Sequence, residues 1–140
     1  MQEFWRRAIY CGLGLWSLST TARADEFSDH IAAIKAVQRE AEGNAAASKA
    51  VVALSVSPIT DLPKVLAQFE GASPLAANYL RSIVETIVDR QIDAGVDISK
   101  SKPDLEAFVL HTKHDPRARR LAYETVLRVD PTVEQRLIPG

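Results

Sequence analysis

Apolar residues recur at helical spacing along most of the chain, and the clearest stripe lies between Pro74 and Gly95. Its apolar positions are Leu75, Tyr79, Leu80, Ile83, Val84, Ile87, Val88 and Ile92. Its charged positions alternate with them and are Arg81, Glu85, Asp89, Arg90 and Asp93. A stripe that repeats about every 3.6 residues is typical of a helix with one buried face. The pattern therefore predicts a long helix that begins at Ser73-Pro74 and ends at Gly95.

Two further segments before this stripe also favour helix. The segment from Asp25 to Glu42 carries apolar residues at helical spacing and ends before Gly43-Asn44; they are Phe27, Ile31, Ile34 and Val37. The segment from Ala45 to Leu54 is rich in alanine, although its pair Val51-Val52 also suits a strand. Because no alternating partner strand occurs elsewhere in the sequence, we predict a helix here, ended by Ser57-Pro58.

Four shorter segments each begin with a capping residue followed by proline, the pattern of a helix start. The pairs are Asp61 with Pro63, Ser101 with Pro103, Asp115 with Pro116, and Asp130 with Pro131. The positions expected to face inward are Leu62, Val65, Leu66 and Phe69; then Leu105, Phe108, Val109 and Thr112; then Ala118, Leu121, Ala122, Thr125, Val126 and Val129; and last Val133, Leu137 and Ile138. Ser101 also has an acid, Asp104, three residues later, which completes a capping-box spacing.

The sequence thus predicts about six helices joined by short turns marked by Pro or Gly. Helices of this length are marginal alone in water, so each must bury its apolar face against neighbours. We expect an all-α fold of antiparallel helical hairpins, because short connections place successive helices side by side. A closed bundle and a row of stacked hairpins both satisfy this pattern.

The first 24 residues have the pattern of a secretory signal peptide. Arg6-Arg7 precedes the uncharged, mostly apolar stretch from Ala8 to Leu18, and Ala22-Arg23-Ala24 has the small-x-small form of a cleavage site. An uncleaved anchor or an N-terminal core helix is the alternative, but the stretch is short for an anchor and acidic residues begin directly after Ala24. We predict a signal peptide at 1–24 and a periplasmic or secreted protein that meets the membrane only during export.

Removal of this segment changes the composition of the working protein. Of the 17 basic and 18 acidic residues in the chain, residues 1–24 hold three and one, so the net charge moves from −1 to −3. Both Trp, the one Cys and the one Met lie in the same segment, so residues 25–140 form no disulfide. The acidic balance also disfavours a nucleic-acid partner.

Three segments of the predicted mature chain resemble HEAT-repeat proteins. The stretch from His114 to Ala122 is similar to the turn and second helix of such a repeat, with Asp-Pro followed by Ala118-Arg119 and Ala122. The stretches 76–81 and 105–110 are similar to the N-terminal region of exported bacterial HEAT-repeat proteins of unassigned function. The resemblance covers roughly residues 43–140. It implies a short HEAT/armadillo-like α-α superhelix, or α-solenoid, that contacts other proteins and carries no catalytic residues.

The resemblance also implies that further repeats follow in members of the family. The final stretch from Arg136 to Gly140 is similar to the opening of a next repeat, so we expect a domain truncated at its C-terminus. Leu137 and Ile138 would then lack full cover and leave an apolar edge. We expect self-association through this edge.

Few residues in the sequence suggest chemistry. His111 and His114 have the i, i+3 spacing of a shared helix face, but His30 is far away in sequence and no third ligand clusters with them. Ser55, Ser57, Ser73 and Ser101 stand where helices end or begin, which capping explains. Glu85 and Asp89 are expected on a solvated face. We therefore predict no catalytic, cofactor-binding or metal-binding residue, and no cofactor.

A basic run follows the last of these histidines and consists of Lys113, Arg117, Arg119 and Arg120. We expect it to meet acidic neighbours such as Glu124, with Arg119 either in an inter-repeat ion pair or paired with Asp115 four residues before it. The prediction for the whole protein is a non-enzymatic protein–protein interaction or scaffold module outside the cytoplasm. The alternative is an accessory or regulatory domain of a larger exported enzyme whose catalytic part is absent from this sequence.

Overall fold

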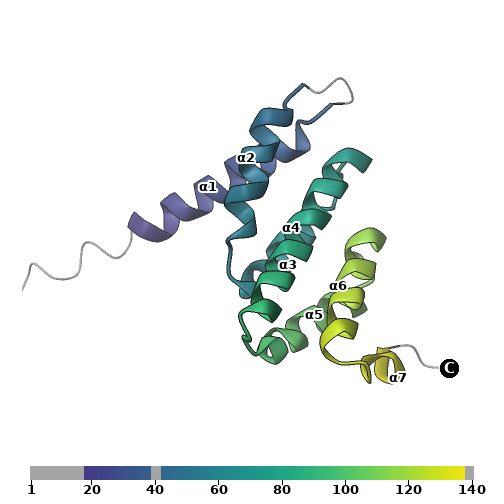
Figure 1. Ribbon diagram of the computed structural model, residues 1–140. Coiled ribbons are helices and arrows are strands. Elements are labelled where there is room, and N and C mark those ends of the chain that lie inside the picture. The colour runs from purple at the N-terminus through teal and green to yellow at the C-terminus, as the bar shows by residue number, and fades with distance from the viewer. Residues whose placement is uncertain (1–17, 39–41, 138–140) are drawn as a thin grey trace, which may run out of the picture.

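The computed structural model describes residues 18–38 and 42–137, and in these residues the protein is all-helical (Figure 1). The α-helices are α1 Leu18–Lys35, α2 Asn44–Ser55, α3 Leu62–Ala67, α4 Pro74–Asp93, α5 Lys102–Leu110, α6 Pro116–Val129 and α7 Val133–Leu137. Two 3₁₀ turns, η1 Ile59–Asp61 and η2 Ile98–Ser101, precede α3 and α5. The described residues contain no strand, so the predicted all-α class is confirmed and α2 is a helix.

Successive helices pack as pairs, α1 with α2, α3 with α4 and α5 with α6. The last pair is antiparallel, as two contacts at its opposite ends show. Near the turn, the Arg119 Nε of α6 donates to the Val109 carbonyl of α5 at 2.7 Å. At the other end, Lys102, which begins α5, is paired with Asp130, which follows α6. These ties explain why the short α5 is stable against its longer neighbour.

Helices α2 and α4 lie against each other and run in the same direction. At the beginning of both, the Tyr79 hydroxyl donates to the Asn44 side-chain oxygen at 3.3 Å. Near the end of both, the Arg90 guanidinium donates to the Ser57 carbonyl. Side chains on α4 therefore hold both ends of the α2 segment.

Helix α6 continues this arrangement, because it runs in the same direction as α4 (Figure 1). An ion pair of 3.0 Å joins Arg81 of α4 to Glu124 of α6, and a second of 2.6 Å joins Asp89 to Arg128 farther along both helices. Helices α2, α4 and α6 thus form a row, with α1 and α2 at one end of the molecule and α6 and α7 at the other.

One apolar core runs through the described chain from α1 to α7. Each α-helix contributes at least one buried apolar side chain, and the fully covered ones include Ile34, Leu62, Leu66, Leu80, Ile83, Ile87, Val126 and Val133. The predicted stripe of α4 supplies the largest share, since it is buried from Ala76 to Val88 along one face. This burial is the main force that holds the short helices together.

Two of the predicted caps have the expected geometry. The Ser73 hydroxyl accepts from the Ala76 backbone N–H at 3.1 Å, and the Asp115 carboxylate accepts from the Arg117 backbone N–H at 2.8 Å. Each residue has an extended backbone that turns its side chain back over the first helical turn. The predicted starts of α4 and α6 are therefore confirmed.

Of the three remaining predicted caps, Asp130 accepts from the Thr132 N–H at 2.9 Å ahead of α7, whereas Asp61 and Ser101 are wrong. Both stand at the cap position, but neither side chain accepts a bond from a helix N–H. Each ends a 3₁₀ turn and has helical rather than extended dihedrals, so its side chain points away from the exposed amides. Asp61 instead accepts from the Lys64 ammonium at 2.9 Å.

The bounds of the first helix differ from the prediction of 25–42. α1 begins at Leu18 and ends at Lys35, and Val37 is buried in the turn that follows rather than in the helix. The chain has to reverse here so that α2 can pack on α1, and Gly43 adopts a positive φ of 80° at the start of α2. Thr112, expected to face inward, is exposed because α5 ends at Leu110.

The predicted cleavage position after Ala24 lies within α1, and residues 1–17 of the predicted signal peptide lie outside the described residues. Cleavage of the chain therefore stays a prediction. In the described part of the chain, no helix combines the length and apolar character that a membrane crossing requires.

Candidate functional site

The two histidines singled out by spacing do not share a helix face. His111 follows the last residue of α5 and has an extended backbone, and His114 lies in the turn before α6. Phe108, His114 and His111 nevertheless form a row of rings, with the His114 ring in the middle. The His114 ring lies flat on the Phe108 ring, with centroids 3.9 Å apart and planes at 5°. The centroid of the His111 ring lies 4.5 Å from that of the His114 ring, and the two planes are tilted by 36°.

This stacking has a consequence for metal binding. Imidazole nitrogens present their lone pairs in the plane of the ring, and two such nitrogens must converge on one ion about 2.0 Å from each. The His114 ring instead lies flat on the apolar Phe108 ring, with the tilted His111 ring beside it. Among the described residues, no group of three or more His, Cys, Asp or Glu side chains could hold a metal ion.

The acid beside these histidines is occupied by Arg117. The Arg117 guanidinium donates to both oxygens of Asp115, at 3.1 Å and 2.8 Å. These hydrogen bonds, more than the other contacts, lower the pKa of Asp115. The predicted pair between Asp115 and Arg119 is therefore wrong, because Arg119 instead donates to the Val109 carbonyl within its own helix pair.

Arg117 also makes a contact that the sequence did not indicate. One of its terminal nitrogens donates to the carbonyls of Phe69 and Ala72, each at 3.1 Å. Both carbonyls belong to the turn between α3 and α4. A single guanidinium thus joins this turn to the beginning of α6.

The basic run meets an acidic neighbour, as expected. Arg120 pairs with Glu124 at 2.9 Å, and the second oxygen of Glu124 faces Arg81 of α4. The hydrogen bond from Arg120 is the largest cause of the lowered pKa of Glu124. These charges join α4 to α6 at the surface.

The two carboxylates of α4 also lie at the surface. Glu85 pairs with Arg81 at 2.8 Å and Asp89 pairs with Arg128 at 2.6 Å, and their side chains are 46% and 56% exposed. Each carboxylate is therefore paired with an arginine at a solvent-exposed position. Both carboxylates therefore take part in surface ion pairs, which agrees with the solvated face expected for them.

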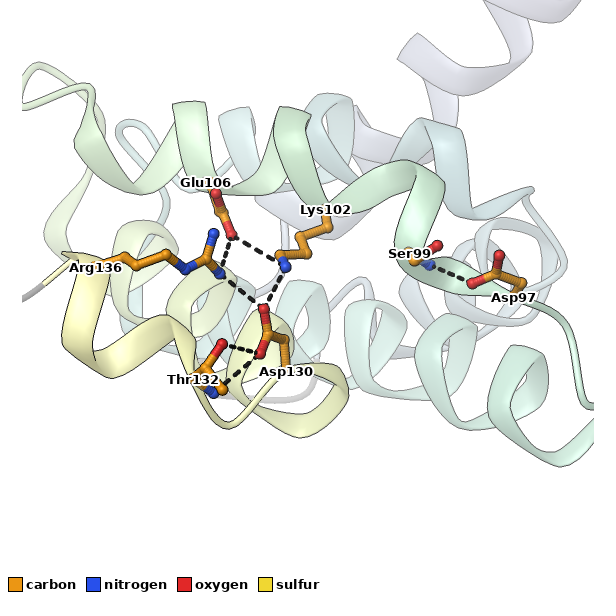
Figure 2. A network of polar contacts seen from close by, with 7 residues as sticks. All are labelled: Asp97, Ser99, Lys102, Glu106, Asp130, Thr132 and Arg136. Carbon is orange, nitrogen blue, oxygen red and sulfur yellow. Dashed lines mark hydrogen bonds and ion pairs between the residues drawn. The ribbon is translucent and has the colours of Figure 1, made fainter.

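Figure 2 shows a polar network that the sequence analysis did not predict. It joins Lys102 and Glu106 of α5, Asp130 and Thr132 of the turn after α6, and Arg136 of α7. Arg136 reaches Glu106 at 2.9 Å and Asp130 at 2.8 Å, while Lys102 contacts the same two carboxylates. Asp130 also accepts from the Thr132 N–H at 2.9 Å. Hydrogen bonds from Lys102, and then from Thr132, hold the pKa of Asp130 far below its usual range.

Two cations and two carboxylates in this network balance each other. The i, i+4 spacing of Lys102 and Glu106 was the one signal visible in the sequence. The remaining contacts join residues that only the packing of α7 on α5 and α6 brings together. The network therefore joins α7 to α5 and to the turn after α6.

Among the described residues, the most exposed large apolar side chains are those of Val52 in α2 and of Val56, which follows the last residue of that helix. Val52 and Val56 are 70% and 67% exposed, and Val52 borders a shallow hollow of about 400 Å³ that is also lined by Ser48, Lys49 and Ala53. The C-terminal edge is better covered than this face. Val133 is fully buried and Leu137 packs half-buried against the core, while Ile138 lies outside the described residues.

In comparisons with known proteins, no family model, no curated protein and no solved structure matches this chain.

Proposed function

We propose that the chain is a non-enzymatic protein–protein interaction or scaffold module that acts outside the cytoplasm. In this proposal its helix pairs are stacked as a short HEAT/armadillo-like superhelix. The observation that carries it is the row of α2, α4 and α6, which run in the same direction and are joined by contacts at both ends. Equivalent helices of successive hairpins are expected to align in this way in an α-solenoid.

The roles of the polar residues support an interaction module over an enzyme. Ser73 and Asp115 cap helices, Arg119 bonds a carbonyl within its own hairpin, and Arg117 joins two turns. Several polar groups that the sequence singled out thus have a structural task. Repeat modules of this kind use an extended concave surface, rather than a deep cleft, to contact their partners.

The location of the protein can be tested through its N-terminus. We expect the chain recovered from the periplasm or medium of expressing cells to begin at Asp25, since the pattern before it is that of a cleavage site. Intact mass and N-terminal sequencing measure this directly. A chain that still begins at Met1 and stays in the cytoplasm would contradict the exported location.

Binding can be tested with photo-crosslinking residues placed at exposed positions of the row, such as Thr86 of α4 and Lys49 of α2. In living cells, we expect a discrete protein adduct at one of these positions and none at the matched position Pro103 of α5. A Leu80→Asp variant, whose core is disrupted, serves as the control for non-specific adducts. Identical adduct patterns at all positions, or none at protein concentrations saturating for micromolar binding (about −8 kcal/mol), would contradict the function.

A further inference from the structure

Helix α1 has an exposed part, residues 22–26, and a packed part that follows it. Ile31 and Ile34 are 6% and 0% exposed, and Phe27 packs partly buried against the apolar core. Residues 22–26, in contrast, are all exposed. The packed part of α1 therefore begins at Phe27, closely after Ala24, the predicted last residue of the signal peptide.

The exposed part is joined to another element through Arg23. This residue lies 3.9 Å from Asp61 of η1, and its side chain is 71% exposed. A pair this open to solvent contributes little to stability. Asp61 is held more closely by Lys64, at 2.9 Å. Loss of Arg23 therefore leaves η1 with its nearer partner.

The charges of α1 suit a helix that begins later than Leu18. As it stands, α1 has no acidic residue in its first turn. Asp25, Glu26 and Asp29 lie farther along the helix. Because the N-terminus of a helix carries a partial positive charge, acidic side chains stabilise it there. A helix that begins at Asp25 places the first two of these acids in its first turn.

We propose that hydrolysis between Ala24 and Asp25 makes Asp25 the N-cap of a shorter α1 that still ends at Lys35. Water adds across the peptide bond, so Ala24 leaves with a new carboxylate and Asp25 gains a free amino group. The cleavage depends on the exported location in the proposed function, because the peptidase that cuts belongs to the export route.

The shortened helix needs a new acceptor for its first turn. The Ala24 carbonyl now accepts from the Ser28 hydroxyl at 3.0 Å. Cleavage removes this carbonyl, and the first backbone N–H groups of the shortened helix have no partner within it. Asp25 stands three residues before Ser28, the spacing at which an N-cap carboxylate accepts from a helix N–H. Asp115 already makes a bond of this kind to the Arg117 N–H at the beginning of α6.

The exposed part also makes the peptide bond accessible. The bond after Ala24 lies within α1, so the helix has to open there before a peptidase reaches it. Opening of residues 22–26 uncovers no buried side chain, since all five positions are exposed already. Helix ends without packing open at almost no cost in free energy. Cleavage after Ala24 therefore leaves the packed part of the fold intact.

The cap can be tested by Asp25→Ala in two forms of the chain. The first is the chain recovered from the periplasm, and the second is the full chain with Ala24→Lys, which breaks the small-x-small pattern and stays uncleaved. In the first form, we expect Asp25→Ala to speed amide hydrogen exchange at residues 29–32 about fivefold, the effect of a lost N-cap. In the second form it should not speed exchange, because alanine is the better helix former at an exposed interior position.

Asp25→Ser in the cleaved chain is the matched control, because serine is also a good N-cap. It should exchange like the parent. The same acceleration by Asp25→Ala in both forms, or none in the cleaved chain, would overturn the cap. An exported chain that begins at a residue other than Asp25 would overturn the cleavage position.

The outcomes separate this cap from the proposed function. A chain that begins at Met1 and stays in the cytoplasm contradicts both the cleavage and the exported location. An exported chain that begins at Asp25 but shows no effect of Asp25→Ala overturns the cap alone. If the cap effect is present but no crosslinked partner is found, only the interaction function is contradicted, because cleavage leaves α2, α4 and α6 intact.

Discussion

Two single arginines of α6 donate hydrogen bonds to backbone carbonyls of other segments of the chain. Arg117 binds Asp115, two residues before it. It also donates to the backbone carbonyls of Phe69 and Ala72, which are 48 and 45 residues away in sequence. Arg119 does the same for Val109 within one helix pair. Hydrogen bonds from charged donors are stronger than those from neutral donors. These contacts therefore help to hold the α3–α4 turn and the end of α5 in place.

We expect Arg117→Ala to lower the free energy of unfolding by about 1 to 2 kcal/mol, because two carbonyls and one carboxylate lose a charged donor at a partly exposed site. Urea unfolding followed by circular dichroism measures the change. The matched variant is Arg120→Ala, whose side chain is 79% exposed and bonds only Glu124. It should cost less than about 0.5 kcal/mol. Equal losses in the two variants would contradict the role of Arg117.

At the scale of elements, helix starts depend on backbone geometry as well as on residue type. Ser73 and Ser101 both precede a helix with Pro in its first turn. Ser73 has an extended backbone and caps α4, whereas Ser101 ends η2 with helical dihedrals and does not cap α5. The same residue type therefore has two different energetic roles.

Replacement by alanine should have different effects at Ser73 and at Ser101. We expect Ser73→Ala to destabilise the protein by about 1 kcal/mol, the usual value for a lost N-cap, and Ser101→Ala to cost clearly less. Thermal unfolding of the two variants beside the parent measures both effects. The prediction fails if Ser101→Ala lowers the melting temperature as much as Ser73→Ala.

The short helix α7 depends on its contacts, because five residues form no stable helix alone. Arg136 joins it to Glu106 and Asp130 (Figure 2). We expect Arg136→Ala to increase amide hydrogen exchange in α7 at least several-fold while leaving α4 unchanged. Gln135→Ala, at an exposed position of the same helix, is the control and should not alter the exchange of α7.

At the scale of the whole molecule, arginine and lysine contacts lower the pKa of several carboxylates, namely Asp115, Glu124 and Asp130. When the folded pKa is below the unfolded value, the unfolded state binds more protons on acidification. The stability that these groups provide is therefore present above about pH 4 to 5, the ordinary range of carboxyl groups, and is lost as the pH falls below it.

We expect the free energy of unfolding to change little between about pH 6 and 8 and to fall steadily below about pH 4.5. Asp130→Asn should be less stable than the parent at neutral pH but should show a shallower fall on acidification, because the group with the most lowered pKa no longer titrates. Urea midpoints measured across this pH range test the slope. Parallel curves for parent and variant would contradict the assignment to Asp130.

Local patterns in the sequence determined the helices themselves. The stripe of α4, the alanine-rich α2 and the caps at Ser73 and Asp115 depend on residues within a few positions of each other, so periodicity and residue type were sufficient. Likewise, Glu124 four residues after Arg120 was a visible ion-pair spacing.

Only the tertiary structure decided which segments meet. It placed Arg117 on the α3–α4 turn, closed the network around Asp130, ended α1 at Lys35 where the chain reverses, and left Val52 and Val56 uncovered. The physical reason is that these contacts join residues far apart in sequence. These contacts stabilise the protein only once the helices have packed, so no local pattern in the sequence indicates them.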